Sequence, residues 1–227
     1  MLHKTKIIAT VGPACNTFEK LLALVQEGVN VFRLNFSHGS HEQHKEVIDH
    51  IKKINEGFPF NIAILADLQG PKLRVGEIEN NALPLKVGDS FYLTNEKCVG
   101  TKEQVYISYP GFYKDVRIGE KILIDDGKIE VRVEEITGDN RVKVVALTEG
   151  VLSSKKGINL PDTKISLPSL TEKDLADVDF IITQEIDWVA LSFVRRPEDI
   201  HELRVKLKEK GSSAKIIAKI EKPEALV

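Results

Sequence analysis

The chain has 227 residues, of which 42% are hydrophobic, enough to bury the cores of one or two globular domains. Its 32 Lys and Arg residues against 34 Asp and Glu give a formal net charge of -2, which excludes a broad basic surface for nucleic acid or an anionic membrane. The sequence lacks an apolar run of membrane-spanning length and a signal-peptide pattern, so we expect a cytoplasmic protein. Cys15 and Cys98 are too far apart in the sequence to indicate a disulfide framework or a zinc site.

Residues 1–70 alternate short apolar runs with amphipathic patterns. The predicted strands are Lys6–Val11, Val29–Asn35 and Asn61–Asp67. One helix is expected between the candidate N-cap Thr17 and Gly28, and another from Ser40 to Glu56. This order of elements predicts a parallel sheet.

Between residues 71 and 167 the pattern changes to short alternating runs without an amphipathic helix. The predicted strands are Ser90–Leu93, Gln104–Ile107, Lys121–Ile124, Ile129–Ile136 and Val142–Leu147. Two turn sequences, Asp126-Gly127 and Gly138–Asn140, stand where tight hairpins are expected. Residues 71–167 are therefore predicted to form an inserted small antiparallel β-barrel domain.

The α/β pattern returns over residues 168–227. The expected elements are a capping box at Thr171–Asp174, a strand over Trp188–Val194, a helix from Pro197 to Gly211 and a strand over Ala214–Ile220. A complete (β/α)₈ barrel takes about 250 residues, whereas the two α/β parts supply about five of the eight units. The predicted fold class is α/β, a partial (β/α)₈ TIM barrel that is truncated before it closes.

Polar residues gather at the carboxyl ends of the predicted parallel strands, where the active site of such a barrel forms. Because side chains alternate along a strand, Arg33, Asn35 and Ser37 are expected to share one face. Asp67 ends the third strand, and two charged residues lie two positions apart at the end of the fifth. The residues expected to converge are Arg33, Asn35, Asp67, Lys219 and Glu221.

These residue types indicate phosphoryl chemistry. An Arg guanidinium and a Lys ammonium suit a phosphate, a Glu carboxylate suits Mg²⁺, and Ser37–Ser40 offers backbone amides before a helix. Phosphoryl transfer depends mainly on positioning and charge neutralisation, which such a set can supply. A single Arg or Asp at a strand end is more often part of a structural ion pair, so the prediction rests on their convergence.

At these residues the sequence resembles the pyruvate kinase family, and the resemblance covers essentially the whole chain. The matching segments are Thr10–Cys15, Phe32–Gly39, Asp67–Arg74, Ile124–Gly127, Lys155–Pro161 and Ile217–Glu221. The resemblance implies a (β/α)₈ domain with a mobile β domain inserted after its third strand. It also implies phosphoryl transfer from phosphoenolpyruvate to ADP, giving pyruvate and ATP in glycolysis.

The resemblance assigns roles to individual residues. Arg33 would hold the phosphate of phosphoenolpyruvate, Lys219 would stabilise the phosphoryl group in transit, and Glu221 would be one of two carboxylate ligands of Mg²⁺ or Mn²⁺. The residues matching the family's monovalent-cation site are Asn35, Ser37, Asp67 and the carbonyl of Leu68. The substrate- or nucleotide-binding set is Arg33, Asn35, Ser37, His38, Arg74 and Lys156.

One residue distinguishes two groups within the family. Members that need K⁺ carry Glu at the position of Lys72, whereas members that work without K⁺ carry Lys there. A lysine ammonium can replace bound K⁺ as a fixed positive charge near the substrate phosphate. We therefore expect K⁺ to be dispensable.

Two interpretations remain open at this point. The chain is part of a pyruvate kinase whose second metal carboxylate and remaining barrel lie beyond Val227, in a full-length parent expected to be a homotetramer. Alternatively, the 227-residue chain is a catalytically incomplete fragment that binds an anion or nucleotide weakly, or acts as an assembly piece. A single carboxylate is a poor Mg²⁺ site, so we expect little turnover by the chain alone.

Overall fold

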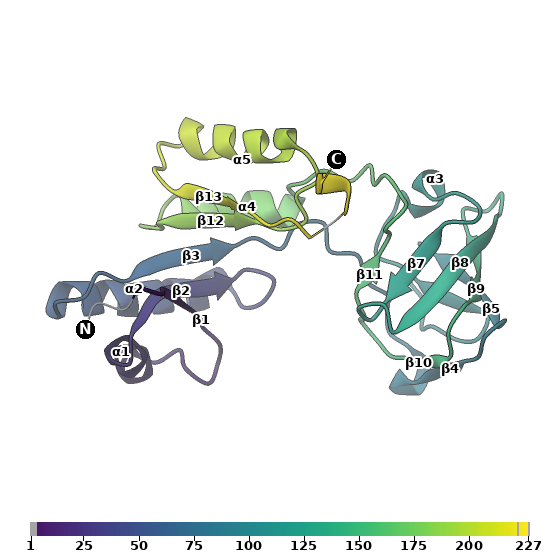
Figure 1. Ribbon diagram of the computed structural model, residues 1–227, viewed down its shortest axis with the longest axis horizontal. Coiled ribbons are helices and arrows are strands. Elements are labelled where there is room, and N and C mark those ends of the chain that lie inside the picture. The colour runs from purple at the N-terminus through teal and green to yellow at the C-terminus, as the bar shows by residue number, and fades with distance from the viewer. Residues whose placement is uncertain (1–3, 222, 227) are drawn as a thin grey trace. The chain divides into compact units, whose positions relative to one another are not determined.

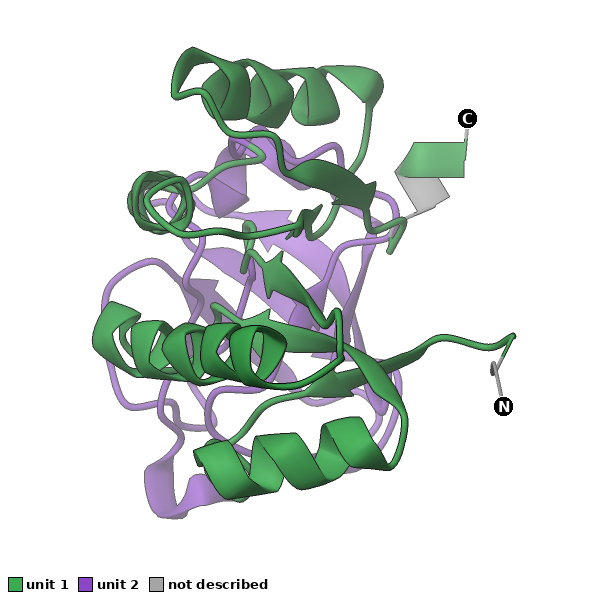
Figure 2. Cartoon of the chain, turned by 90° about the vertical axis from the view of Figure 1, so that its left-hand side faces the viewer, with its two compact units in different colours: residues 1–71, 169–227 green, residues 72–168 purple. Residues whose placement is uncertain are grey.

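The computed structural model describes residues 4–221 and 223–226. The chain divides into two compact units, residues 1–71 with 169–227 (unit 1) and residues 72–168 (unit 2). Figure 1 labels the elements, and Figure 2 colours unit 1 green and unit 2 purple. In the described part of the chain, we find no helix with the length and apolar character needed to cross a membrane.

Unit 1 contains a parallel five-stranded sheet, which confirms the predicted α/β class. Its strands, in spatial order, are β1 (Ile7–Thr10), β2 (Val29–Asn35), β3 (Ala63–Asp67), β12 (Trp188–Leu191) and β13 (Lys215–Ala218). The carboxyl ends of the central strands are in register, because Asn35 pairs with Asp67 and Asp67 pairs with Ala190. Residues from distant parts of the chain therefore meet at one edge of the sheet (Figure 1).

Four helices pack on one face of this sheet, as the green unit in Figure 2 shows. They are α1 (Phe18–Gln26), α2 (His41–Gly57), α4 (Glu172–Ile181) and α5 (Pro197–Glu209). Ser40 caps α2, and Thr171 forms the expected capping box with Asp174 at the start of α4. Thr17 is the N-cap residue of α1, as predicted, but its side chain makes no capping hydrogen bond.

Unit 2 consists mainly of short strands. A six-stranded sheet has the order β11 (Ile158–Asn159), β7 (Lys121–Ile124), β8 (Ile129–Ile136), β9 (Val142–Ala146), β5 (Ser90–Thr94) and β6 (Gln104–Tyr106). The remaining elements of unit 2 are the paired strands β4 (Leu83–Leu85) and β10 (Gly150–Leu152), the short helix α3 (Phe112–Asp115) and a 3₁₀ turn at Glu79–Asn81. Unit 1 also contains a 3₁₀ turn, at Pro223–Leu226. The hairpin turn after β7 lies at Asp125–Lys128, with positive φ angles at Asp125, Asp126 and Gly127.

The antiparallel prediction for this unit was wrong at one pair. Strands β5 and β6 run parallel, because the long segment 95–103 between them crosses over instead of forming a tight hairpin. Isolated bridges join the two edges of the sheet to a single segment: Arg74 pairs with Gly157 beside β11, and Val75 pairs with Ile107 beside β6. The side chains enclosed by these strands form a separate apolar core, which contains the fully buried Phe112 and Tyr109.

Candidate functional site

Alternation along the strands of unit 1 separates the face that packs on the helices from an opposite face, which is polar at the carboxyl ends of the strands. In β2, Phe32 and Leu34 are buried against the helices, whereas Arg33 and Asn35 point to the opposite face. In the other strands the face opposite the helices carries apolar residues, such as Leu65 and Ala190, and becomes polar at the carboxyl ends. The polar residues at the carboxyl ends on that face are Thr10, Arg33, Asn35, Asp67, Ser192 and Lys219.

Asp67 is the centre of this polar cluster. Its side chain is only 3% exposed, and its Oδ2 lies 2.6 Å from Nη2 of Arg33 and accepts a 2.7 Å hydrogen bond from Nε of the same residue. Nζ of Lys219 approaches the carboxylate at 3.3 Å. A buried carboxylate is stable when cations and hydrogen bonds compensate its lost hydration. The cluster thus holds two cationic side chains, both 29% exposed, beside one buried anion.

Lys219 lies beyond the end of β13 but remains fixed by backbone hydrogen bonds. Its N–H donates to the carbonyl of Leu191 at 3.0 Å, and its carbonyl accepts from the N–H of Val194 at 3.2 Å. Its ammonium lies 3.4 Å from Glu221 Oε1. The structure therefore brings together Arg33, Asp67, Lys219 and Glu221, as the strand alternation predicted.

Sequence reasoning missed two residues of the cluster. Nη1 of Arg33 donates to Oγ1 of Thr10 at 2.9 Å, and Nζ of Lys219 donates to Oγ of Ser192 at 2.8 Å. Each residue occupies the same face as Asp67, at or just beyond the carboxyl end of its own strand. The alternation used for Arg33 and Lys219 would have found both residues, had it been extended to β1 and β12.

A strained turn supports the carboxylate of Glu221. The predicted strand Trp188–Val194 ends early at Leu191, because Phe193 adopts a positive φ of 56°. In this conformation the N–H of Phe193 donates to Glu221 Oε2 at 3.0 Å. Glu221 consequently has a defined place next to Lys219, although its side chain is 37% exposed.

The loop after β2 is held from behind by two helices. Nζ of Lys173, in α4, donates to the carbonyl of Phe36 at 2.6 Å and pairs with Asp177 at the same distance. Nε2 of His44, in α2, lies 3.0 Å from the carbonyl of His38. Burial lowers the pKa of His44, and the neutral ring fits its contact with the loop. These contacts fix the backbone that carries the predicted residues Ser37 and His38.

The residues predicted for a monovalent cation have the following positions. Asn35 and Asp67 pair across β2 and β3, and Oδ1 of Asn35 accepts the N–H of Ser37 at 3.1 Å. The carbonyl of Leu68 accepts the hydroxyl of Ser192 at 2.6 Å. Four predicted donor residues therefore lie along the ends of two neighbouring strands.

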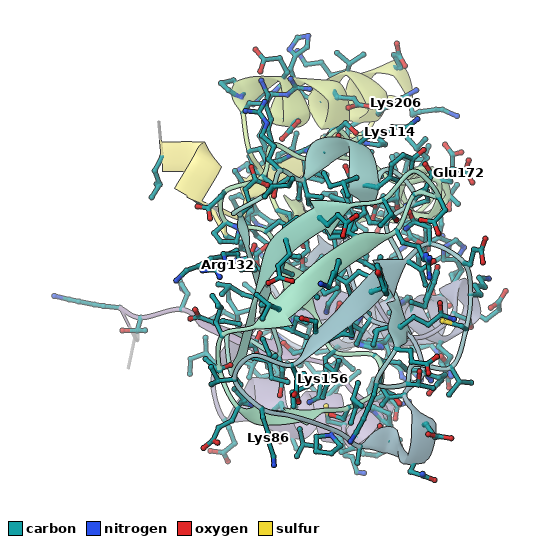
Figure 3. All side chains as sticks on the ribbon, turned by 90° about the vertical axis from the view of Figure 1, so that its right-hand side faces the viewer. Lys86, Lys114, Arg132, Lys156, Glu172 and Lys206 are labelled. Atoms are coloured by element: carbon teal, nitrogen blue, oxygen red, sulfur yellow. The ribbon has the colours of Figure 1, made fainter. Side chains whose placement is uncertain are left out.

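Arg74 and Lys156, predicted on the nucleotide side, both belong to unit 2 (Lys156 is labelled in Figure 3). Nη1 of Arg74 donates to the carbonyl of Lys155 at 2.8 Å, so the two segments lie side by side. The ammonium of Lys156 is 3.1 Å from Asp125. Lys156 and Lys128 hold the pKa of Asp125 below its usual value, which keeps this carboxylate ionised.

Comparison with known proteins decides the family. The family model described as "Pyruvate kinase, barrel domain" matches residues 2–227. The chain belongs to the pyruvate kinase family. It is 41% identical over 226 residues to proteins named "Pyruvate kinase" from Staphylococcus aureus strains USA300, NCTC 8325 / PS 47 and COL. Each alignment covers 99% of this chain and 39% of the relative, so the chain spans about two fifths of the length of these pyruvate kinases.

The Mg²⁺ that a pyruvate kinase implies needs several oxygen ligands. Within residues 4–221 and 223–226, no group of three or more His, Cys, Asp and Glu side chains is arranged to hold a metal ion. Asp67 is engaged by Arg33 and Lys219, so among the described residues Glu221 is the one more exposed carboxylate of the cluster. One carboxylate does not make a Mg²⁺ site, so the described residues do not fit the metal by themselves.

Proposed function

We propose that this chain provides the phosphate-handling part of a pyruvate kinase that transfers the phosphoryl group of phosphoenolpyruvate to ADP, giving pyruvate and ATP in glycolysis. The observation that carries the proposal is the meeting of Arg33 and Lys219 at Asp67, at the carboxyl ends of parallel strands. Both cationic side chains are 29% exposed, so their N–H groups can donate charge-assisted hydrogen bonds to a bound phosphate. Family membership supplies the substrate class.

In this proposal the two cations act at different stages. The guanidinium of Arg33, oriented by Asp67 and Thr10, binds the phosphate of phosphoenolpyruvate. The ammonium of Lys219 stabilises the charge on the phosphoryl group as it moves to ADP. The contacts of Lys219 with Asp67, at 3.3 Å and 3.4 Å, are longer than the 2.7 Å bond from Arg33, so Asp67 engages the ammonium less strongly than the guanidinium.

The remaining assignments are proposals that follow the same resemblance. Glu221 is one ligand of Mg²⁺ or Mn²⁺ and needs a second carboxylate from outside the described residues. The monovalent-cation positions are Asn35, Ser37, Asp67 and Leu68, and the nucleotide-side positions are His38, Arg74 and Lys156. Lys72 makes K⁺ dispensable by supplying a positive charge of its own.

We also propose the finer fold and the setting of the protein. The five parallel strands are the first five of a (β/α)₈ barrel, and residues 71–167 are its inserted β domain. The bridges at Arg74 and Val75, which join both edges of the unit 2 sheet, support a barrel-like insertion. We place the complete protein in the cytoplasm as a homotetramer.

The second candidate is that the 227-residue chain is catalytically incomplete and binds an anion or nucleotide weakly, or serves as an assembly piece. The lack of a complete carboxylate group for Mg²⁺ among the described residues favours this reading for the chain alone. Both candidates share the same pyruvate kinase parentage. They differ in turnover.

A coupled assay tests the proposal. Pyruvate formation from phosphoenolpyruvate and ADP is measured with Mg²⁺, for the 227-residue chain and for a longer pyruvate kinase that carries this segment. We expect turnover by the longer enzyme and little by the chain, and we expect Lys219→Ala to slow the longer enzyme at least about a hundredfold, since it removes a transition-state charge contact.

The matched control is Lys215→Ala, because Lys215 lies at the other end of β13 and stacks on Trp188. It should leave the rate unchanged within about twofold. Equal rates for Lys219→Ala and Lys215→Ala would overturn the role of Lys219. Robust turnover by the 227-residue chain would overturn its incompleteness.

A further inference from the structure

Ser192 joins Lys219 to the backbone of the neighbouring strand. It directly follows β12 and is 4% exposed. Its Oγ accepts a 2.8 Å hydrogen bond from Nζ of Lys219 and donates a 2.6 Å hydrogen bond to the carbonyl of Leu68. One hydroxyl therefore bridges a cation from β13 and a carbonyl at the end of β3.

The direction of these hydrogen bonds is fixed by chemistry. An ammonium can only donate, so Ser192 must be the acceptor toward Lys219. A carbonyl can only accept, so the single hydroxyl proton points to Leu68. The contact between Ser192 Oγ and Asp67 Oδ1 is longer, at 3.4 Å, and does not compete with the 2.6 Å bond. The hydroxyl thus presents a lone pair to Lys219 in a single orientation.

We propose that Ser192 is a positioning residue that orients the ammonium of Lys219 for phosphoryl transfer. A lysine side chain is long and flexible, and its contacts to Asp67 and Glu221 are 3.3 Å or longer. The 2.8 Å bond to Ser192 is the shortest hydrogen bond that the described residues make to this ammonium. Ser192 itself is 4% exposed and is hydrogen-bonded to the carbonyl of Leu68, so it serves as the reference point for the ammonium.

The turn around Ser192 explains its rigidity. Gly70 packs directly on it: a Cβ at Gly70 would lie 2.9 Å from the carbonyl oxygen of Ser192. On its other side Phe193 holds the strained φ of 56°. A serine fixed between a close backbone contact and a strained residue can hold a catalytic cation in one place.

The effect of Ser192 on the rate rests on the proposed function, whereas its hydrogen bond to Lys219 can be tested without it. In the 227-residue chain, ¹⁵N spectra of the lysine Nζ groups report whether the Lys219 ammonium is hydrogen-bonded and exchanges slowly with water. We expect such a signal in the unmodified chain, assigned by its loss in Lys219→Arg. We expect the signal to disappear in Ser192→Ala and Ser192→Cys.

The cysteine variant separates packing from hydrogen bonding, because a thiol fills the space of the hydroxyl but is a weak donor and acceptor. The control is Ser169→Ala, since Ser169 is equally buried (3% exposed) and its hydroxyl bonds Glu202 instead. The control should keep the Lys219 signal. An unchanged signal in Ser192→Ala, or no slowly exchanging signal in the unmodified chain, would overturn the proposal.

The kinetic experiment uses the longer pyruvate kinase that carries this segment. Ser192→Ala and Ser192→Cys should lower kcat about tenfold or more and change KM for phosphoenolpyruvate less than about twofold, because the lost contact serves the transition state. A loss shared by Ser169→Ala would indicate a general structural effect and overturn positioning. If the unmodified enzyme has no turnover, the proposed function fails while the Nζ spectra still decide the position of Lys219.

Discussion

Asp67 determines what the two cations of the cluster can do. Its buried carboxylate holds Arg33 by a charge-assisted hydrogen bond of 2.7 Å and Lys219 at 3.3 Å. The difference in distance shows that Asp67 engages the guanidinium more strongly than the ammonium, whose shortest hydrogen bond, at 2.8 Å, goes to Ser192. At the scale of single residues, this unequal sharing of one anion is the physical basis that we propose for a site that binds and then transfers a phosphoryl group.

The prediction at this scale concerns Lys72. A longer pyruvate kinase with this segment should keep its rate when tetramethylammonium replaces K⁺, because the lysine supplies a permanent positive charge. Lys72→Glu should then make the rate fall about tenfold or more without K⁺ and recover with it. Steady-state rates with each cation measure this.

The control for that experiment is Lys86→Glu, the same charge change at an exposed lysine after β4. It should leave the response to K⁺ unaltered. Near-complete loss of rate in the unmodified enzyme without K⁺ would contradict the role of Lys72.

At the scale of elements, the site depends on where strands stop. Sequence reasoning extended two strands to Val194 and Ile220, but β12 ends at Leu191 and β13 ends at Ala218. The positive φ of Phe193 ends β12, and such an angle in a bulky residue has no local sequence signal. The alternation of side chains still located Arg33, Asp67 and Lys219, because it depends only on strand periodicity.

Unit 2 shows which strand pairings a local sequence pattern predicts and which it does not. The turn at Asp125–Lys128 was predictable from its Asp-Gly sequence. The parallel pairing of β5 with β6 was not, because it depends on contacts between distant residues, such as the bridge between Ile78 and Gly100. Short strands with long connections therefore need tertiary information that local patterns lack.

The prediction at the element scale concerns the turn after β3. Gly70 has a φ of 65°, and a Cβ there would lie 2.9 Å from the backbone oxygen of Ser192. We expect Gly70→Ala to lower the free energy of unfolding of unit 1 by about 2–4 kcal/mol, from backbone strain and crowding. Denaturant titration followed by the fluorescence of Trp188, the one tryptophan in the sequence, measures it.

The matched control is Gly57→Ala at the end of α2, where an added Cβ would meet no atom within 4 Å. It should change the free energy of unfolding by less than about 1 kcal/mol. Equal effects of the two substitutions would contradict the close approach at Gly70.

At the scale of the whole molecule, the alternation of elements predicted the parallel sheet, and the family match accounts for residues 2–227. The chain nevertheless spans 39% of the length of the relatives that it matches. Its described residues offer Glu221 as a carboxylate for Mg²⁺, which needs more oxygen ligands. Under the proposed function, binding of the substrate phosphate is therefore separable from its transfer. We propose that binding uses Arg33 and Lys219, which lie together beside Asp67.

The most direct test is calorimetric binding of phosphoenolpyruvate to the 227-residue chain at low ionic strength, with Arg33→Ala, Lys219→Ala and the control Lys215→Ala. We expect the unmodified chain and Lys215→Ala to bind alike, and Arg33→Ala and Lys219→Ala to bind at least about tenfold more weakly, since each loses a charge-assisted contact to the phosphate. Binding by Arg33→Ala as strong as that of the unmodified chain would contradict the account.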